Sequence, residues 1–147
     1  MPTSLSLPLK SADDLFEKLK RDATLLDSEV TTDRFFNFVI TGYSLIDWVK
    51  ADPAMATVEV ESLYANRWLK ICGDLATAGK HFELSRRLPI TIEASSSQGY
   101  GCGRYGRGGY GTGEEQIQIK LNDGTVINCL DFVREVVAFW AMVFSNI

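Results

Sequence analysis

The stretch TTDRFFNFVITGYSLIDWVKADP, residues 31–53, decides the fold because apolar side chains occupy nearly every side of the helix it predicts. The helix begins at Thr31 or Thr32 and ends at Asp52, since a residue before proline avoids the helical conformation. A helix with so little polar surface needs cover on several sides, so we expect it at the centre of a bundle. Two apolar stripes follow the helical period: Phe35, Phe38, Val39, Leu45 and Val49 form one, and Phe36, Ile40 and Tyr43 form the other.

Three further segments have helical periodicity. Residues 11–29 open with Ser11 as the N-cap and carry one apolar face. Residues 128–147 open with Asn128 as the cap and are apolar almost all round after Glu135, which indicates a buried core helix. The third segment, residues 58–80, is expected to bury Tyr64, Trp68, Ile71, Leu75 and Ala78.

Before the last helix the period changes from helical to two. Residues 88–93 and 114–121 alternate apolar with polar side chains, as half-buried strands do. Asn-Asp-Gly at 122–124 signals a tight turn, and the chain then returns as a third strand. The sequence therefore predicts one domain over residues 1–147, mainly α, built as a four-helix bundle with a small antiparallel β meander inserted before the last helix.

The segment SSSQGYGCGRYGRGGYGTG, residues 95–113, connects the first two predicted strands. Its glycines predict a flexible loop. No GK[ST] follows the G-x-G spacing and no helix begins there, which argues against a phosphate-binding loop. The alternative is a contact surface, because tyrosines stack on unpaired bases while arginines meet phosphates. The candidate binding residues here are Arg104, Tyr105, Arg107 and Tyr110.

A basic edge precedes and includes this loop. The chain has a net charge of −4, yet between Lys80 and Arg107 five basic residues stand against two acidic ones, an excess of three positive charges. Arg67, Lys70, Asp74, Thr77 and His81 recur at spacings of three and four and form one polar stripe on the third helix. We expect the stripe and the loop to share a surface, with binding residues Arg67, Lys70, Lys80, Arg86 and Arg87.

His81 is the only histidine of the chain and the candidate acid–base residue. Asp74 lies about two helical turns earlier and is the candidate group that orients the imidazole. The competing interpretation is a histidine that caps the helix end or packs against Phe82. One histidine without clustered carboxylates or cysteines supplies too few metal ligands, so we predict no metal site and no cofactor.

The segment CGDLATAGKHFEL, residues 72–84, resembles the histidine-bearing segment of HEPN-type helical domains. That family is frequent in bacterial toxin–antitoxin and antiphage systems, and many members are metal-independent RNases that use an arginine and a histidine a few residues apart. The resemblance implies a helical bundle and a bacterial or phage origin. Where the arginine should lie, this chain has Asp74, Leu75 and Ala76. This departure favours a partner-binding domain over a nuclease.

Two functional hypotheses follow. The first is a non-enzymatic binding or regulatory module of a bacterial or phage-encoded protein, which engages a protein or an RNA through the basic edge and the loop. The second is a metal-independent RNase or nucleotide-handling enzyme that uses His81 as its acid–base group. A third expectation concerns self-association, because the apolar surface of the last helix allows a homodimer through it.

Location and membrane contact are also predicted from sequence. The amino terminus lacks the charged start and apolar run of a secretory signal, and no apolar run is long enough to cross a bilayer. Cys72, Cys102 and Cys129 stand at wide spacings and are interpreted as reduced thiols. We therefore expect a cytoplasmic protein without membrane contact.

Overall fold

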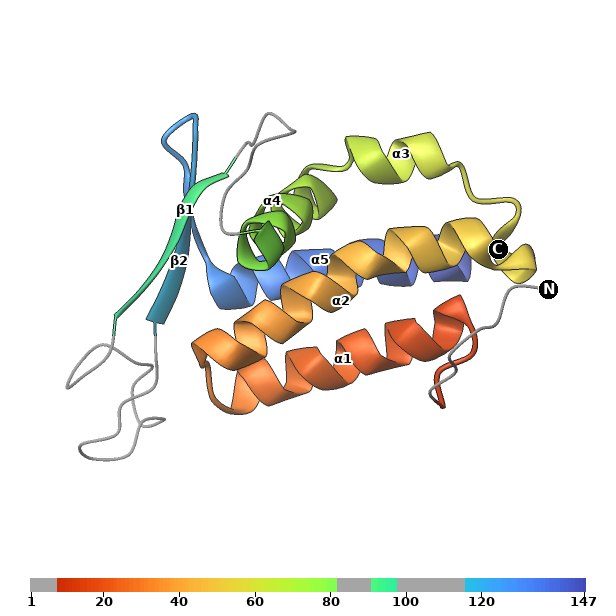
Figure 1. Cartoon of the computed structure of the whole chain (residues 1–147), viewed down its shortest axis with the longest axis horizontal. Coiled ribbons are helices and arrows are strands. Elements are labelled where there is room, and N and C mark those ends of the chain that lie inside the picture. The colour runs from red at the N-terminus through yellow and green to blue at the C-terminus, as the bar shows by residue number, and fades with distance from the viewer. Residues whose placement is uncertain (1–7, 82–90, 98–115) are drawn as a thin grey trace.

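The computed structural model describes the backbone of residues 8–81, 91–97 and 116–147, and the side chains of residues 8–78 and 116–147. Over these ranges it confirms the predicted fold class: a mainly α bundle with a small antiparallel sheet before the last helix (Figure 1). The helices are α1 (Ala12–Ser28), α2 (Thr32–Ala51), α3 (Val60–Ala65), α4 (Arg67–His81) and α5 (Cys129–Ser145), with a 3-10 turn at Pro53–Met55. The strands are β1 (Thr91–Ser97), β2 (Gln116–Leu121) and β3 (Val126–Asn128).

Helix α2 is the centre of the bundle, as predicted. The Thr31 side chain accepts a hydrogen bond from the backbone N–H of Arg34 and caps the helix. Figure 1 shows α2 between α1 and α4, with α5 behind it. At Gly42 these helices approach so closely that a Cβ atom would lie 3.3 Å from the sulfur of Cys72. The Trp140 indole N–H also donates to the Gly42 carbonyl, at 3.2 Å, which ties α5 to α2 at the same point.

A polar network joins α1 to α2 inside this apolar bundle. Lys18 Nζ donates to Asp22 Oδ2 at 2.7 Å and to Thr41 Oγ1 at 2.9 Å. Asn37 Nδ2 donates to the other carboxylate oxygen of Asp22 at 3.1 Å. Asp22 and Thr41 are both buried. We call Lys18, Asp22, Asn37 and Thr41 the α1–α2 network; because its buried groups satisfy one another, it fixes how the two helices align.

The prediction of a single helix over residues 58–80 is wrong. The structure has two helices here, α3 and α4, which are separated by Asn66. The Asn66 backbone is extended, with φ −68° and ψ 129°. Its side-chain oxygen accepts hydrogen bonds from the backbone N–H groups of Trp68 at 2.9 Å and Leu69 at 3.2 Å. Asparagine favours this capping role over a place inside a helix, because its side chain competes for backbone groups.

The break at Asn66 also changes which residues are buried. Ile71 is buried as predicted, whereas Tyr64 is 42% exposed and Trp68, Leu75 and Ala78 are only partly buried. The fully covered apolar positions of this region are Leu63, Leu69, Ile71 and Cys72. The sequence analysis applied one helical period to residues 58–80 and therefore predicted the wrong buried positions. The reason is that α3 and α4 are separate helices with different directions (Figure 1).

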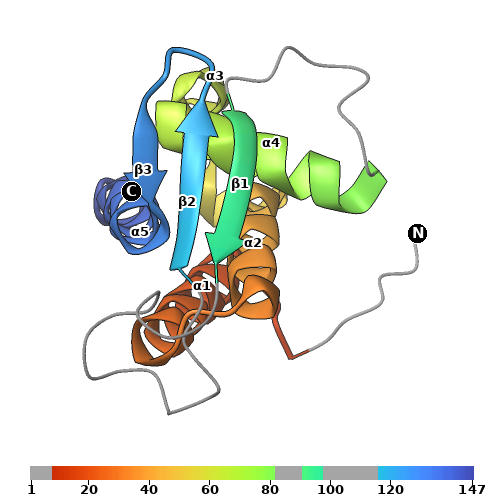
Figure 2. The same ribbon diagram turned by 90° about the vertical axis from the view of Figure 1, so that its left-hand side faces the viewer.

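The sheet has the strand order β1-β2-β3, with both pairs antiparallel. Ile117, Ile119 and Leu121 of β2 are buried and alternate with exposed residues, as the period of two predicted. Gly124 adopts φ 90° in the turn before β3, a conformation that glycine takes without strain. Figure 2 shows this sheet from its open side, with the helices behind it.

The predicted loop over 95–113 begins later than expected, because Ser95, Ser96 and Ser97 belong to β1 and pair with β2. Ser97 faces Gln116 at one end of the sheet, and Thr91 faces Leu121 at the other. Residues 98–113 of the predicted loop lie outside the described residues. The structure thus fixes the two strand ends from which the loop starts and to which it returns.

Helix α5 covers α1, α2 and α4 and carries the largest buried side chain, Trp140. Phe16 of α1 stacks on Phe144, with ring centroids 4.7 Å apart, and so joins the start of α1 to the end of α5. Asn128 caps α5 through a hydrogen bond from the Leu130 N–H, as predicted. None of the described helices combines the length and apolar character required to cross a membrane.

Candidate functional site

Only part of the predicted site falls on described side chains. Arg67, Lys70 and Asp74 are described in full. Lys80 and His81 form the end of α4, but their side chains are outside the described residues. The predicted residues that lie outside altogether are Arg86, Arg87, Arg104, Tyr105, Arg107 and Tyr110.

The predicted polar stripe on α4 is not one exposed surface. Arg67 and Lys70 are exposed, but Asp74 is 1% exposed. Asp74 follows Arg67 by two helical turns and points in nearly the same direction. It is buried because it lies in the middle of α4, where α2, α5 and β1 pack against the helix, while Arg67 stands at the helix start.

The burial of Asp74 bears on its predicted role. Burying a carboxyl group to this degree is costly unless polar groups of the protein replace its contacts with water. Asp74 therefore belongs to the packing around α4, and a substrate at the protein surface would not touch it. This burial could not be predicted from the sequence, because the residue types on either side of Asp74 do not reveal which elements cover it.

A cluster that was predicted from the sequence only in part, through Arg67 and Lys70, lies where α2, α3 and α4 meet. Lys50, near the end of α2, donates a hydrogen bond from Nζ to the Tyr64 hydroxyl at 3.3 Å and lies 5.5 Å from the centre of the Tyr64 ring. This hydrogen bond raises the pKa of Lys50 above its ordinary value. Tyr64 itself is 42% exposed on α3, so the aromatic ring and its cation both reach the surface.

A second cation–aromatic pair follows across the helix break. The Arg67 guanidinium lies 5.4 Å from the centre of the Trp68 ring. Trp68 is partly buried and its ring lies 6.2 Å from that of Phe132 in the core, so one side of the indole is anchored. Lys70 is exposed nearby on the same helix. We call Lys50, Tyr64, Arg67, Trp68 and Lys70 the α3–α4 corner.

Negative groups stand among these cations. Asp123, in the turn between β2 and β3, has its pKa lowered, first by hydrogen bonds from Thr125 and further by the positive charge of Arg67. Asp47, one turn before Lys50, adds to the rise in the pKa of that lysine. The corner is therefore a surface of mixed charge rather than a continuous positive field.

The electrostatic interaction between Arg67 and Asp123 also places the corner relative to the sheet. Asp123 follows Leu121, at the end of β2 opposite Gln116. The five residue steps of β2 separate these ends by about 17 Å. Arg67 therefore lies near one end of the sheet, while the segment after Ser97 starts from the other end. The described residues do not bring Arg67 next to the strand ends that carry the predicted loop.

Metal and thiol chemistry can be assessed only on the described residues. Among them, no three His, Cys, Asp or Glu side chains gather closely enough to hold a metal ion. Cys72 and Cys129 are buried thiols outside any disulfide, and burial raises the pKa of Cys72 far above its ordinary value. At neutral pH, Cys72 is therefore a packing residue and not a nucleophile.

Comparisons of this chain with protein-family models, with curated proteins and with solved structures found no match.

Proposed function

We propose that the chain is a non-enzymatic binding module that contacts a protein partner through the α3–α4 corner. The observation that carries this proposal is the pair of cation–aromatic contacts at the surface, Lys50 with Tyr64 and Arg67 with Trp68. Tyrosine, tryptophan and arginine are the residue types that contribute most binding energy in protein interfaces. Rings already held by neighbouring groups also lose less conformational freedom on binding.

A protein is favoured over RNA because of the charges at the corner. Nucleic-acid binding gains most of its affinity from many cations that meet phosphates at once. Here Arg67 has Asp123 close by and Lys50 has Asp47, in a chain whose net charge is −4. Mixed charges of this kind suit a protein surface that presents complementary groups of both signs.

The basic edge predicted from the sequence is part of the proposal as a second contact region. Its support is the local excess of positive charge between Lys80 and Arg107 and the tyrosines of the 95–113 segment. The HEPN resemblance of residues 72–84 adds a bacterial or phage origin, and the proposal includes a cytoplasmic location.

The test compares capture from an extract of the native host by the whole chain and two double variants. In the corner variant, Tyr64→Ala is combined with Arg67→Ala. In the control, Arg21→Ala is combined with Leu25→Ala, which also removes one exposed cation and one exposed apolar side chain, on α1. We expect proteins that the chain and the control retain and the corner variant loses, with nuclease treatment making no difference. Equal capture by all three, or loss after nuclease treatment, overturns the proposal.

The competing function, RNA cleavage by His81, is tested separately. The purified chain and a His81→Ala variant are incubated with labelled single-stranded RNA, and the products are separated on a denaturing gel. We expect no cleavage by either protein. Cleavage by the chain that disappears in His81→Ala would replace the binding module with a nuclease, since a contaminating enzyme would be unaffected by the substitution.

A further inference from the structure

We propose that the Asp123–Gly124 linkage, in the turn between β2 and β3, is a site of spontaneous backbone modification. The linkage converts to isoaspartate through a cyclic imide, and the folded turn holds this reaction back. Asp-Gly occurs once in the chain, and Asn-Gly does not occur. Both residues are exposed, so water reaches the linkage. Glycine favours the reaction, because no side chain hinders the approach of its nitrogen to the neighbouring carboxyl group. The inference does not depend on the proposed function.

The reaction consumes nothing but water, which it also releases. The Gly124 nitrogen attacks the side-chain carboxyl carbon of Asp123. An N–C bond forms, a C–O bond of the carboxylic acid breaks, and the amide hydrogen leaves with the hydroxyl group as water. Water then opens the cyclic imide at one of its two carbonyl carbons. Opening at the side-chain carbonyl restores aspartate, and opening at the main-chain carbonyl leaves the chain linked through the side chain, which is isoaspartate.

The attacking nitrogen is restrained by the turn. The Gly124 N–H donates a hydrogen bond to the Leu121 carbonyl at 3.0 Å, and the Leu121 N–H donates to the Thr125 carbonyl at 2.8 Å. The Leu121 side chain is buried, so it anchors this pair of bonds to the core. The attack removes the hydrogen from the Gly124 nitrogen, so its bond to Leu121 has to break first. The linkage therefore reacts only when the turn opens locally.

The carboxyl group is restrained as well. Asp123 Oδ1 accepts a hydrogen bond from the Thr125 N–H at 2.9 Å. Hydrogen bonds from Thr125 lower the pKa of Asp123, and the positive charge of Arg67 lowers it further. A carboxylate is a much poorer target for the amide nitrogen than the neutral acid, because it has no hydroxyl group to release as water. The turn thus favours the unreactive form of one group and immobilises the other.

The conversion would alter the α3–α4 corner without changing the net charge. In isoaspartate the main chain runs through the former side-chain carbon, and the carboxylate is attached directly to Cα. The negative charge that interacts with Arg67 would therefore move. One extra backbone carbon would also enter the turn between Leu121 and Thr125, whose hydrogen bonds fit the ordinary backbone. We therefore expect the converted chain to unfold at a lower temperature than the unconverted one.

The first test compares the folded and the denatured whole chain at physiological temperature and mildly acidic pH. Both are digested, and isoaspartate at position 123 is quantified by chromatography and mass spectrometry. The conversion leaves the peptide mass unchanged, whereas deamidation of Asn122 would raise it. We expect conversion at least about tenfold faster in guanidinium chloride, because the bonds that restrain both reacting groups are lost there.

Asp123→Glu is the control for this comparison, because its longer side chain would have to close a larger and less readily formed imide ring. Its peptide should stay unconverted in both states. Equal rates of conversion in the folded and the denatured chain would show that the turn does not hold the reaction back. No conversion in the denatured chain would show that the linkage is not a modification site. Either result overturns the proposal.

The second test concerns the contact that protects the carboxyl group. Thr125→Ala should speed up conversion in the folded chain, because the Thr125 side chain contributes most to the lowered pKa of Asp123. Thr125→Ser is the matched variant, since it keeps a hydroxyl group at this position, and it should convert at the rate of the unchanged chain. An unchanged rate in Thr125→Ala would overturn the protective role of Thr125.

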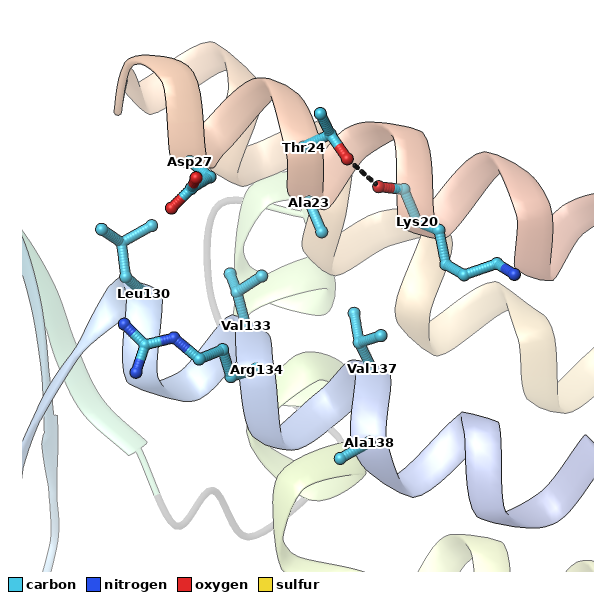
Figure 3. A pocket seen from close by; sticks show the side chains of 9 residues that line it. All are labelled: Lys20, Ala23, Thr24, Asp27, Leu130, Val133, Arg134, Val137 and Ala138. Atoms are coloured by element: carbon cyan, nitrogen blue, oxygen red, sulfur yellow. Dashed lines mark hydrogen bonds between the residues drawn. The ribbon is translucent and has the colours of Figure 1, made fainter.

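The same digests contain an internal comparison, the Asp27–Ser28 linkage. Asp27 lies near the end of α1 and lines a hollow between α1 and α5 (Figure 3). Its carboxyl group is followed by serine, whose side chain hinders the approach of the nitrogen. In the denatured chain, Asp27–Ser28 should therefore convert more slowly than Asp123–Gly124. Equal rates at the two linkages would overturn the role assigned to Gly124.

Discussion

The α1–α2 network and the α3–α4 corner use similar residues at opposite degrees of burial. In the network, Lys18 donates to Asp22 and Thr41, and these two groups are buried between the helices. At the corner, Lys50 donates to Tyr64, and both residues remain at the surface. A buried polar contact fixes how helices align, because breaking it leaves groups without water or partner. An exposed contact contributes little to folding and stays available to a binding partner.

The largest effect is expected from breaking the network. Asp22→Ala removes the acceptor of Lys18 and Asn37 and should lower the free energy of unfolding by about 2–3 kcal/mol. The measurement is urea denaturation followed by circular dichroism. Glu17→Ala is the control on the same helix, because its ion pair with Lys20 is exposed, and its effect should stay within about 0.5 kcal/mol. Equal effects of the two substitutions would contradict the structural role of the network.

The next effect concerns the helix break that shapes the corner. Asn66→Ala removes the side-chain oxygen that caps α4 and should cost about 1 kcal/mol, a fall in Tm of about 2–4 °C. Asn66→Asp keeps an acceptor at this position and should retain most of the stability. Thermal unfolding of the three proteins distinguishes them. If Asn66→Ala raised the Tm, the straight helix predicted from the sequence would be intrinsically preferred here.

A smaller stability effect is expected at the corner itself. Tyr64→Ala and Arg67→Ala should each change the free energy of unfolding by less than about 0.5 kcal/mol, because their contacts are exposed. The same urea titrations provide the measurement. A loss as large as that of Asp22→Ala would show that the corner holds α3 against α4, and its residues would then be packing residues rather than contact residues for a partner.

The smallest effect is a pH dependence at the turn beside the corner. The pKa of Asp123 is lowered, first by hydrogen bonds from Thr125 and then by the Arg67 charge. A lowered folded-state pKa adds stability that is present above the ordinary pKa of 3.8 and is lost as the pH falls through the folded-state pKa. In an NMR titration of the carboxyl carbon, Thr125→Ala should raise the pKa of Asp123 more than Arg67→Ala does. The opposite order would mean that the charge dominates.

Local signals were enough to predict most of the fold. Ser11, Thr31 and Asn128 cap the helices that the apolar periods predicted, and the alternation of Ile117, Ile119 and Leu121 predicted β2. These signals depend on residues close together in the chain, so they can be identified without knowledge of the tertiary structure. The break at Asn66 was missed, because apolar residues continue at helical spacing on both sides of it and hide the cap.

The candidate site was less predictable, because it depends on long-range packing. Burial of Asp74 follows from the elements that cover the middle of α4, which its own helix does not specify. The contact of Lys50 with Tyr64 arises only because the chain turns back between α2 and α3. Exposed Arg67 and Lys70 were correctly expected on the surface, but the described strand ends separate Arg67 from the start of the predicted loop.

The most direct test of the central claim places a photo-crosslinking amino acid at position 70, in the whole chain within its native host. The account predicts a discrete protein adduct from position 70, because Lys70 is exposed and lies about one helical turn after Arg67 of the Arg67–Trp68 pair. The same amino acid at position 21, an exposed site on α1, should give no such adduct. Identical adducts from both positions, or an adduct that nuclease removes, would contradict a protein-binding corner.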